Sequence, residues 1–169
     1  MPKPTYRDEK GRTRWIRNDE IAATVKQLGD FLIIGGYPED HAKRYAQIAH
    51  TVSRWPESID TLAVDDRLNE IPGVGGVITG YLQDIIATGT TDKFDDDQYG
   101  KPPPRSVLEL TDIERLGAKT ARTLYQEHGI DSLQHLCTAL ADGSLDGIRG
   151  IGPKMRDTLS KQCKKHGHS

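Results

Sequence analysis

Three segments of the chain follow one pattern, and this internal repeat limits the possible folds more than any other feature. The segments are residues 68–82 (LNEIPGVGGVITGYL), 110–124 (LTDIERLGAKTARTL) and 145–159 (LDGIRGIGPKMRDTL). Each begins with Leu, has Ile three residues later, then an apolar residue followed by Gly, and closes with Leu at its fifteenth position. Self-similarity of this kind indicates one supersecondary unit used three times.

Each copy is typical of a short helix, a tight turn and a second helix. Gly75, Gly117 and Gly152 occupy equivalent positions at the end of the turn, and the apolar residue before each is expected to plug the turn into the core. Glycine permits positive φ and lets a ligand approach the backbone closely. The first N–H groups of the second helix have no intrahelical partner. Each turn is therefore a candidate anion site that binds phosphodiester oxygens without reading base sequence.

This unit is identified as the helix-hairpin-helix motif. The alternative is that the glycine turns only connect packed helices, and short glycine motifs often arise without function. Three copies in register favour the motif. We therefore expect an all-α fold built from tandem helix-hairpin-helix units.

The rest of the chain predicts further helices and two domains. A first helix is expected to begin at Asn18, which would cap it, and to carry one apolar stripe. A second helix is expected from Glu39 to about Arg54. The expected buried positions of the two helices are Ile21, Val25, Leu28, Leu32, Ala42, Tyr45, Ala49 and Val52. The polar, aperiodic residues 1–17 predict a flexible arm. An acidic, proline-rich linker at 92–104 is expected to separate a domain at 18–91 from one at 105–169.

Positive charge is distributed unevenly over the three turns. The net charge of the chain is −2, but residues 57–100 carry ten acidic and only two basic side chains, and no Lys or Arg occurs from Leu68 to Asp92. Cations surround the second and third turns instead, so we expect those two to bind a polyanion most strongly. The candidate phosphate-binding residues are Gly73, Gly75, Arg115, Gly117, Lys119, Arg149, Gly150, Gly152, Lys154 and Arg156.

The order of these segments resembles the amino-terminal part of bacterial-type family X DNA polymerases, the relatives of polymerase beta. The resemblance covers residues 18–165 and depends mainly on IPGVG with the ATG that follows it and on LYQEHGIDSLQHL. It implies a polymerase-beta-type amino-terminal domain that binds gapped DNA, with Tyr45 as a stacking residue. It also implies a monovalent cation, Na⁺ or K⁺, held at the hairpin turns by the carbonyls of Ile113 and Leu116.

Two activities of that family depend on residues that this chain lacks. The polymerase palm requires three metal-binding aspartates, and Asp95 and Asp97 lie in a charged, proline-bounded linker without a strand pattern. The lyase reaction requires a lysine that forms a Schiff base, and Tyr81 occupies that position. Lys43 or a residue of the arm, Lys3 or Lys10, is the remaining alternative nucleophile. We expect no enzymatic activity.

The sequence favours sequence-independent DNA binding as the function. The expected partner is gapped or nicked duplex DNA, and the expected role is in DNA repair. The alternative is a protein-interaction or regulatory scaffold whose acidic 57–100 face docks a protein partner. No side-chain metal site and no other cofactor is expected. Cys137, read as a small buried residue, and Cys163 form no paired motif, which favours a reducing, cytoplasmic location. No apolar run is long enough to cross a membrane.

Overall fold

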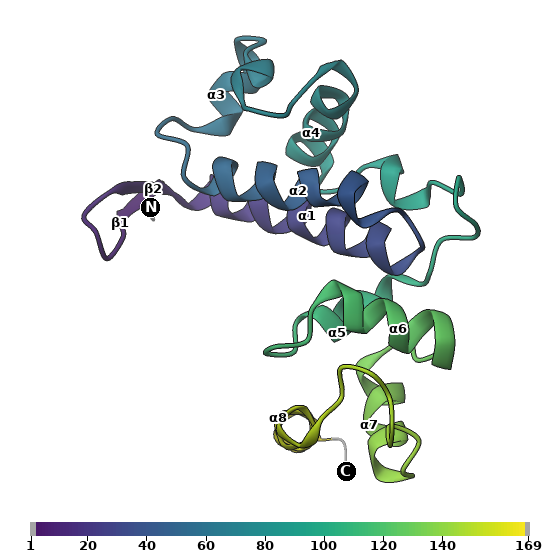
Figure 1. Ribbon diagram of the computed structural model, residues 1–169. Coiled ribbons are helices and arrows are strands. Elements are labelled where there is room, and N and C mark those ends of the chain that lie inside the picture. Colours follow the sequence, from purple (N-terminus) through teal and green to yellow (C-terminus); the bar gives the residue numbers. More distant parts are fainter. Residues whose placement is uncertain (1–2, 168–169) are drawn as a thin grey trace. The chain divides into compact units, whose positions relative to one another are not determined.

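The computed structural model describes residues 3–167, and the chain is mostly helical with one two-stranded sheet (Figure 1), which confirms the helical class. The regular elements are β1 (Thr5–Arg7), β2 (Thr13–Trp15), α1 (Ile16–Ile34), α2 (Glu39–Ser53), α3 (Ile59–Val64), α4 (Gly76–Thr88), α5 (Leu108–Thr111), α6 (Ala118–His128), α7 (Leu133–Ala141) and α8 (Pro153–Lys165). Short 3-10 turns lie at Leu68–Glu70, Asp92–Asp95 and Arg105–Val107. None of the helices in the described part combines the length and the apolar character that a membrane crossing requires.

The chain divides into two compact units. The first unit contains the residues up to Gly29 together with Glu39–Asp96, and the second contains Asp30–Pro38 together with the residues from Asp97 onward. The end of α1 and the turn after it therefore belong to the second unit. Within the expected linker, Phe94 is buried, so part of this acidic segment has a packed apolar anchor.

Helix α1 carries the predicted apolar stripe, which runs from the first unit to Leu32 in the second. Ile21, Val25, Leu28 and Leu32 are all buried, as the spacing of apolar residues predicts. The start of the helix differs from the prediction, because α1 begins at Ile16 and Asn18 lies inside it.

Asn18 holds a distant turn instead of capping its own helix. Its side chain is fully buried, and its Oδ1 accepts a hydrogen bond from the backbone N–H of Ile59 at 2.8 Å. Its Nδ2 donates to the carbonyl of Glu57 at 2.9 Å. Since Ile59 is the first residue of α3 and Ser58 makes no side-chain capping bond, Asn18 satisfies an amide at the start of α3.

Helices α1 and α2 pack closely where α1 has a glycine. A Cβ placed on Gly29 would lie 3.0 Å from the Cβ of Tyr45 and 3.3 Å from the carbonyl oxygen of Ala42. Ala42, Tyr45, Ala49 and Val52 of α2 are buried, as predicted. The ring of Tyr45 thus belongs to the core of the unit and is not available for stacking on a base.

The segment before α1 is an ordered β-hairpin where an aperiodic arm was expected. Thr5–Arg7 and Thr13–Trp15 pair antiparallel. The carboxylate of Asp8 accepts hydrogen bonds from the guanidinium groups of Arg12 and Arg14, each at 2.9 Å. These contacts hold the pKa of Asp8 far below its usual value; the hydrogen bond from Arg14 has the largest effect, followed by that from the backbone amide of Arg12. Strands of three residues are too short to show alternation, so sequence periodicity did not reveal them.

In the second unit, residues contributed by the end of α1 take part in the core. Phe31, Ile34 and Tyr37 are buried. The guanidinium carbon of Arg105 lies 5.6 Å from the ring centre of Phe31, and Nε2 of Gln126 donates to the carbonyl of Ile34 at 2.9 Å.

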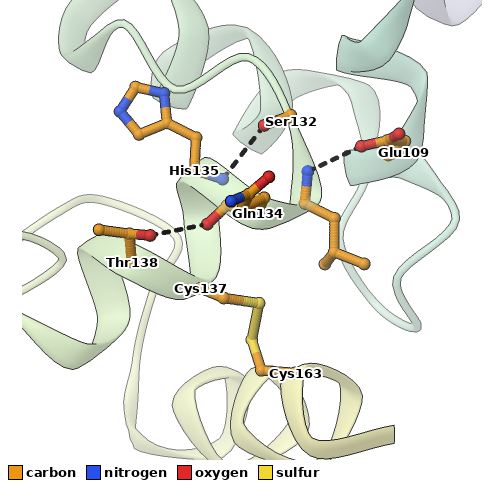
Figure 2. The surroundings of a disulfide bond; sticks show 8 residues. Glu109, Ser132, Gln134, His135, Cys137, Thr138 and Cys163 are labelled. Carbon is orange, nitrogen blue, oxygen red and sulfur yellow. Dashed lines mark hydrogen bonds between the residues drawn. A yellow bond between two sulfur atoms is a disulfide. The ribbon is translucent and has the colours of Figure 1, made fainter. Parts of the chain in front are cut away.

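A disulfide bond joins α7 to α8 (Figure 2). Cys137 and Cys163 are bonded through their sulfur atoms, with 5.8 Å between their Cα atoms. Cys137 is buried, as predicted, but the expectation that the two cysteines are unpaired is wrong, and they no longer argue for a reducing compartment. They lie 26 residues apart, and only the packing of α7 on α8 brings them together.

Candidate nucleic-acid interface

The turns of the three repeated segments share one backbone conformation. In every copy, the residue two positions before the glycine that ends the turn has a positive φ. The values are +86° at Gly73, +69° at Arg115 and +90° at Gly150. The residue that precedes each following helix is extended, with φ of −99° at Gly75, −88° at Gly117 and −93° at Gly152. The turn and the helix after it are thus repeated, but the element before the turn differs: a 3-10 turn at Leu68–Glu70, α5 at Leu108–Thr111, and no regular helix between α7 and the third turn.

The apolar residue in the middle of each turn points into the core. Val74, Leu116 and Ile151 are all buried, as predicted. Their backbone N–H groups donate to the carbonyls of Ile71, Ile113 and Ile148 at 3.0, 3.1 and 3.1 Å. Each turn is therefore fixed from within by one apolar side chain and one hydrogen bond, and α4, α6 and α8 begin directly after it.

The last glycine of each turn is not required by the protein itself. A Cβ at Gly75, Gly117 or Gly152 would meet no atom within 4 Å, and the φ of all three is negative. An L-residue would fit there without strain. These positions are exposed and lie beside the first amides of a helix. The missing side chain leaves room for something outside the chain to reach those amides.

Arg115 takes a conformation that favours glycine. Within the described residues, it and Asp66 are the non-glycine positions with positive φ. Such a conformation costs an ordinary residue about 1 kcal/mol relative to glycine. The arginine that replaces the expected glycine therefore does not change the turn, which keeps the backbone of the other two copies.

The second and third turns meet at one hollow. A shallow depression of about 600 Å³ is lined by Arg115 of the second turn and by Gly150, Gly152, Pro153, Lys154 and Met155 of the third. Gly150 is also in tight contact with α6, since a Cβ there would lie 2.9 Å from Oγ1 of Thr120. The structure thus brings Arg115 together with Gly150, Gly152 and Lys154, which were predicted from separate copies of the repeat.

The other candidate cations are arranged less favourably. Arg149 and Lys119 are exposed but do not line the hollow. Arg156 forms an ion pair with Asp146, with 3.1 Å between Nη2 and Oδ1. A phosphate would have to compete with this carboxylate for Arg156.

The first turn lies in an acidic environment. Gly73 and Gly75 are exposed and belong to the first unit, while the remaining candidate residues belong to the second. Arg67, shortly before this turn, is held by Glu70 at 2.8 Å and Glu57 at 3.0 Å, and its contact lowers the pKa of Glu70. The side chain after the turn, Val77, is 69% exposed.

A lysine that the sequence reasoning missed lies next to Tyr81. The Nζ of Lys93 is 5.8 Å from the centre of the Tyr81 ring and 2.5 Å from Oδ2 of Asp96, and its side chain is 12% exposed. Lys93 follows Tyr81 by twelve residues, after α4 has ended, so no motif spacing connects the two. Its ammonium group is paired with the Asp96 carboxylate.

The carbonyls expected to hold a monovalent cation belong to the second turn. The carbonyl of Ile113 accepts the N–H of Leu116 at 3.1 Å, which uses one of its two lone pairs. Among residues 3–167, no three His, Cys, Asp or Glu side chains are grouped as metal ligands would be.

The sequence was also compared with known proteins. No protein family matches the chain, and no curated protein is significantly similar to it.

Proposed function

We propose that the chain binds DNA independently of sequence, through two helix-hairpin-helix turns of its second unit. The observation that carries this proposal is the shared hollow, where Arg115 of one turn lies with Gly150, Gly152 and Lys154 of the next. The third turn thus presents the start of α8 to this hollow, and each of the two turns supplies one cation to it.

The chemistry of the hollow suits phosphodiester oxygens. The amides at the start of α8 have no intrahelical partner, and the helix dipole adds partial positive charge there. Arg115 and Lys154 supply full charges, and Arg115 is able to bind a phosphate with two parallel hydrogen bonds. None of these groups reads the edge of a base, so affinity should depend on salt and hardly on sequence.

The resemblance to family X polymerases extends this proposal to gapped or nicked duplexes in DNA repair. The chain binds without polymerase or lyase chemistry, because Tyr81 replaces the Schiff-base lysine and no palm carboxylates are present in the sequence. The first hairpin then acts mainly as a scaffold, since its acidic surroundings oppose the approach of phosphates.

Glycine-to-serine exchange at the three equivalent positions tests the proposal. A serine at Gly152 or Gly117 would cap its helix and fill the space beside the open amides. We expect Gly152→Ser to leave the thermal stability unchanged or slightly raised, while affinity for gapped duplex DNA falls roughly tenfold. Fluorescence anisotropy at two salt concentrations measures the affinity.

The first turn offers a matched control. Gly75→Ser makes the same change in the same backbone conformation, beside acids instead of cations. It should not alter the affinity. Charge reversal gives a second comparison, in which Lys154→Glu weakens binding more than Lys101→Glu, an exposed lysine outside the hollow. Equal effects of Gly75→Ser and Gly152→Ser would contradict the assignment of the binding surface.

A protein-interaction scaffold is the second candidate, and the acidic segment 57–100 favours it. Residues 57–100 carry ten acidic side chains, and Arg67 is already paired with Glu57, Glu70 and Asp65. A surface of this charge suits a basic partner. If the wild-type chain binds no DNA even at low salt, the scaffold function replaces the DNA-binding one.

A further inference from the structure

The disulfide bond encloses the third turn. Cys137 lies in α7 and Cys163 in α8, and the 26-residue separation between them contains Gly150, Gly152 and Lys154. The whole of the third hairpin is therefore a loop closed by one covalent bond. What happens to that bond affects the turn directly.

Helix α7 is anchored independently of the disulfide (Figure 2). The Oγ of Ser132 accepts the N–H of His135 at 3.1 Å, and Oε1 of Glu109 accepts the N–H of Leu133 at 3.0 Å. The second bond ties the start of α7 to α5. Since α7 is held at this end, cleavage of the disulfide would release α8 more than α7.

Helix α8 connects the disulfide to the hollow. Gly152 precedes its first residue and Cys163 lies in its last turn, so the two are separated by roughly 16 Å of helix at 1.5 Å per residue. The disulfide fixes the far end of α8, while the contact of Gly150 with Thr120 fixes the near end. The disulfide and this contact therefore hold the two ends of α8.

We propose that the Cys137–Cys163 disulfide is a redox-operated latch that sets the DNA affinity of the third turn. This inference rests on the proposed DNA-binding function. A dithiol reductant supplies two electrons and two protons, the S–S bond breaks, two cysteine thiols form, and the reductant becomes a disulfide. The oxidised chain is the tight-binding form and the reduced chain the weak one.

The position of Cys163 near the end of α8 lets a reductant reach its sulfur atom. Both cysteines are buried, at 2% and 4% exposure. Cys163 lies two residues before the end of α8 at Lys165, and terminal helical turns open at little cost in free energy. Opening that turn exposes its sulfur to an attacking thiolate without unfolding the unit.

The buried side chains of the third hairpin should keep it folded after reduction. Leu145, Ile148, Ile151 and Leu159 are buried within the enclosed loop, and Leu136 is buried in α7. The reduced state is thus expected to lose the alignment of α8 and to retain its helices. This property distinguishes a latch from a bond that is needed for folding.

The test compares the oxidised chain, the chain reduced with dithiothreitol, and the double variant Cys137→Ala/Cys163→Ala. Hydrogen exchange at the amides of residues 148–156 reports the latch, and anisotropy with gapped duplex reports DNA binding. We expect faster exchange at these amides, an affinity lower by roughly tenfold, and a salt slope smaller by about two in the reduced chain. The double variant should match the reduced chain and should not respond to dithiothreitol.

The two readouts separate the latch from the proposed function. Faster exchange on reduction with no DNA binding in either state would show that the disulfide holds the third turn, but it would reject both the proposed function and the control of DNA affinity. Equal exchange in the oxidised and reduced chains would overturn the latch, even if both bind DNA. Loss of helical circular dichroism on reduction would also overturn it, because the bond would then be a requirement for folding.

Discussion

Gly150 of the third turn is in contact with Thr120 of α6, the helix that follows the second turn. A Cβ on Gly150 would lie 2.9 Å from Oγ1 of Thr120, closer than Cβ atoms come to other atoms, and 3.2 Å from its Cγ2, which is a tight contact. Glycine is needed here for two reasons: a side chain would collide with Thr120, and the φ of +90° is strained for any other residue. The contact sets the distance between the two turns that line the hollow.

The contact predicts the effect of a methyl group at this position. Gly150→Ala should lower the free energy of unfolding by about 2–3 kcal/mol, from positive-φ strain plus overpacking. Gly147→Ala is the matched control, because its φ is +80° and a Cβ there meets nothing within 4 Å. It should cost only the strain, about 1 kcal/mol. Urea denaturation measures both, and adding Thr120→Ala should restore part of the loss in Gly150→Ala only.

Replacing Arg115 with glycine should separate stability from binding. Arg115→Gly removes the strain of a positive φ and should stabilise the chain by up to about 1 kcal/mol, less the entropy that glycine adds to the unfolded state. The same variant removes a cation from the hollow, so its affinity for DNA should fall severalfold. Thermal melting and anisotropy measure the two effects.

Asp66→Gly is the control for this prediction. Asp66 has φ of +57°, lies in the first unit and does not line the hollow. It should gain stability in the same way and lose no affinity. If Arg115→Gly binds DNA as tightly as the wild type, Arg115 is only a turn residue.

Asn18 is predicted to be essential for the stability of the first unit. Asn18→Ala leaves the buried N–H of Ile59 without its acceptor and the carbonyl of Glu57 without its donor. The expected loss is about 2–3 kcal/mol in the free energy of unfolding. Asn69→Ala, at an exposed position, should change it by less than about 0.5 kcal/mol. Equal losses in the two variants would show that the Asn18 contacts do not hold α3.

The β-hairpin should loosen in acid. Hydrogen bonds from the Arg14 side chain, which has the largest effect, and from the Arg12 backbone amide lower the pKa of Asp8 in the folded chain. A carboxyl whose folded pKa is depressed stabilises the fold above its unfolded pKa, near 3.8, and the contribution is lost as the pH falls through the folded value. The protection of the amides in residues 5–15, measured against their intrinsic exchange rate at the same pH, should therefore fall below about pH 4.

Asp8→Asn tests this origin of the acid sensitivity. The hairpin of this variant should already exchange faster at neutral pH and should show little further change in acid. Glu9→Gln, the neighbouring carboxylate, should behave like the wild type. An unchanged pH profile in Asp8→Asn would place the acid sensitivity elsewhere.

Local patterns predicted the parts of the fold that depend on neighbouring residues. The stripe that includes Val25 and Leu28 followed from helical spacing, and the burial of Leu116 and Ile151 followed from the repeat. The repeat also aligns Arg115 with the positive-φ glycines of the other copies, and its φ is positive as well. Regular spacing is visible in a sequence because it arises within one element.

The features that sequence missed depend on long-range contacts. Asn18 binds residue Ile59, 41 positions away, and Cys137 meets Cys163 only because α7 packs on α8. Asn18 resembles a helix cap in sequence because asparagine at the start of an apolar stripe usually is one. The hollow beside Arg115 has the same origin, since it needs two turns from different copies of the repeat.

The membership of residues 30–38 in the second unit has a practical consequence. A fragment excised at the acidic linker, beginning near Arg105, would lack Phe31, Ile34 and Tyr37 and would expose the apolar surface they cover. Arg105 would lose the ring it lies over, and Gln126 the carbonyl to which it donates. Truncation at the apparent boundary in the sequence would thus yield an incomplete and aggregation-prone product, and dissection of this protein must leave its longest helix uncut.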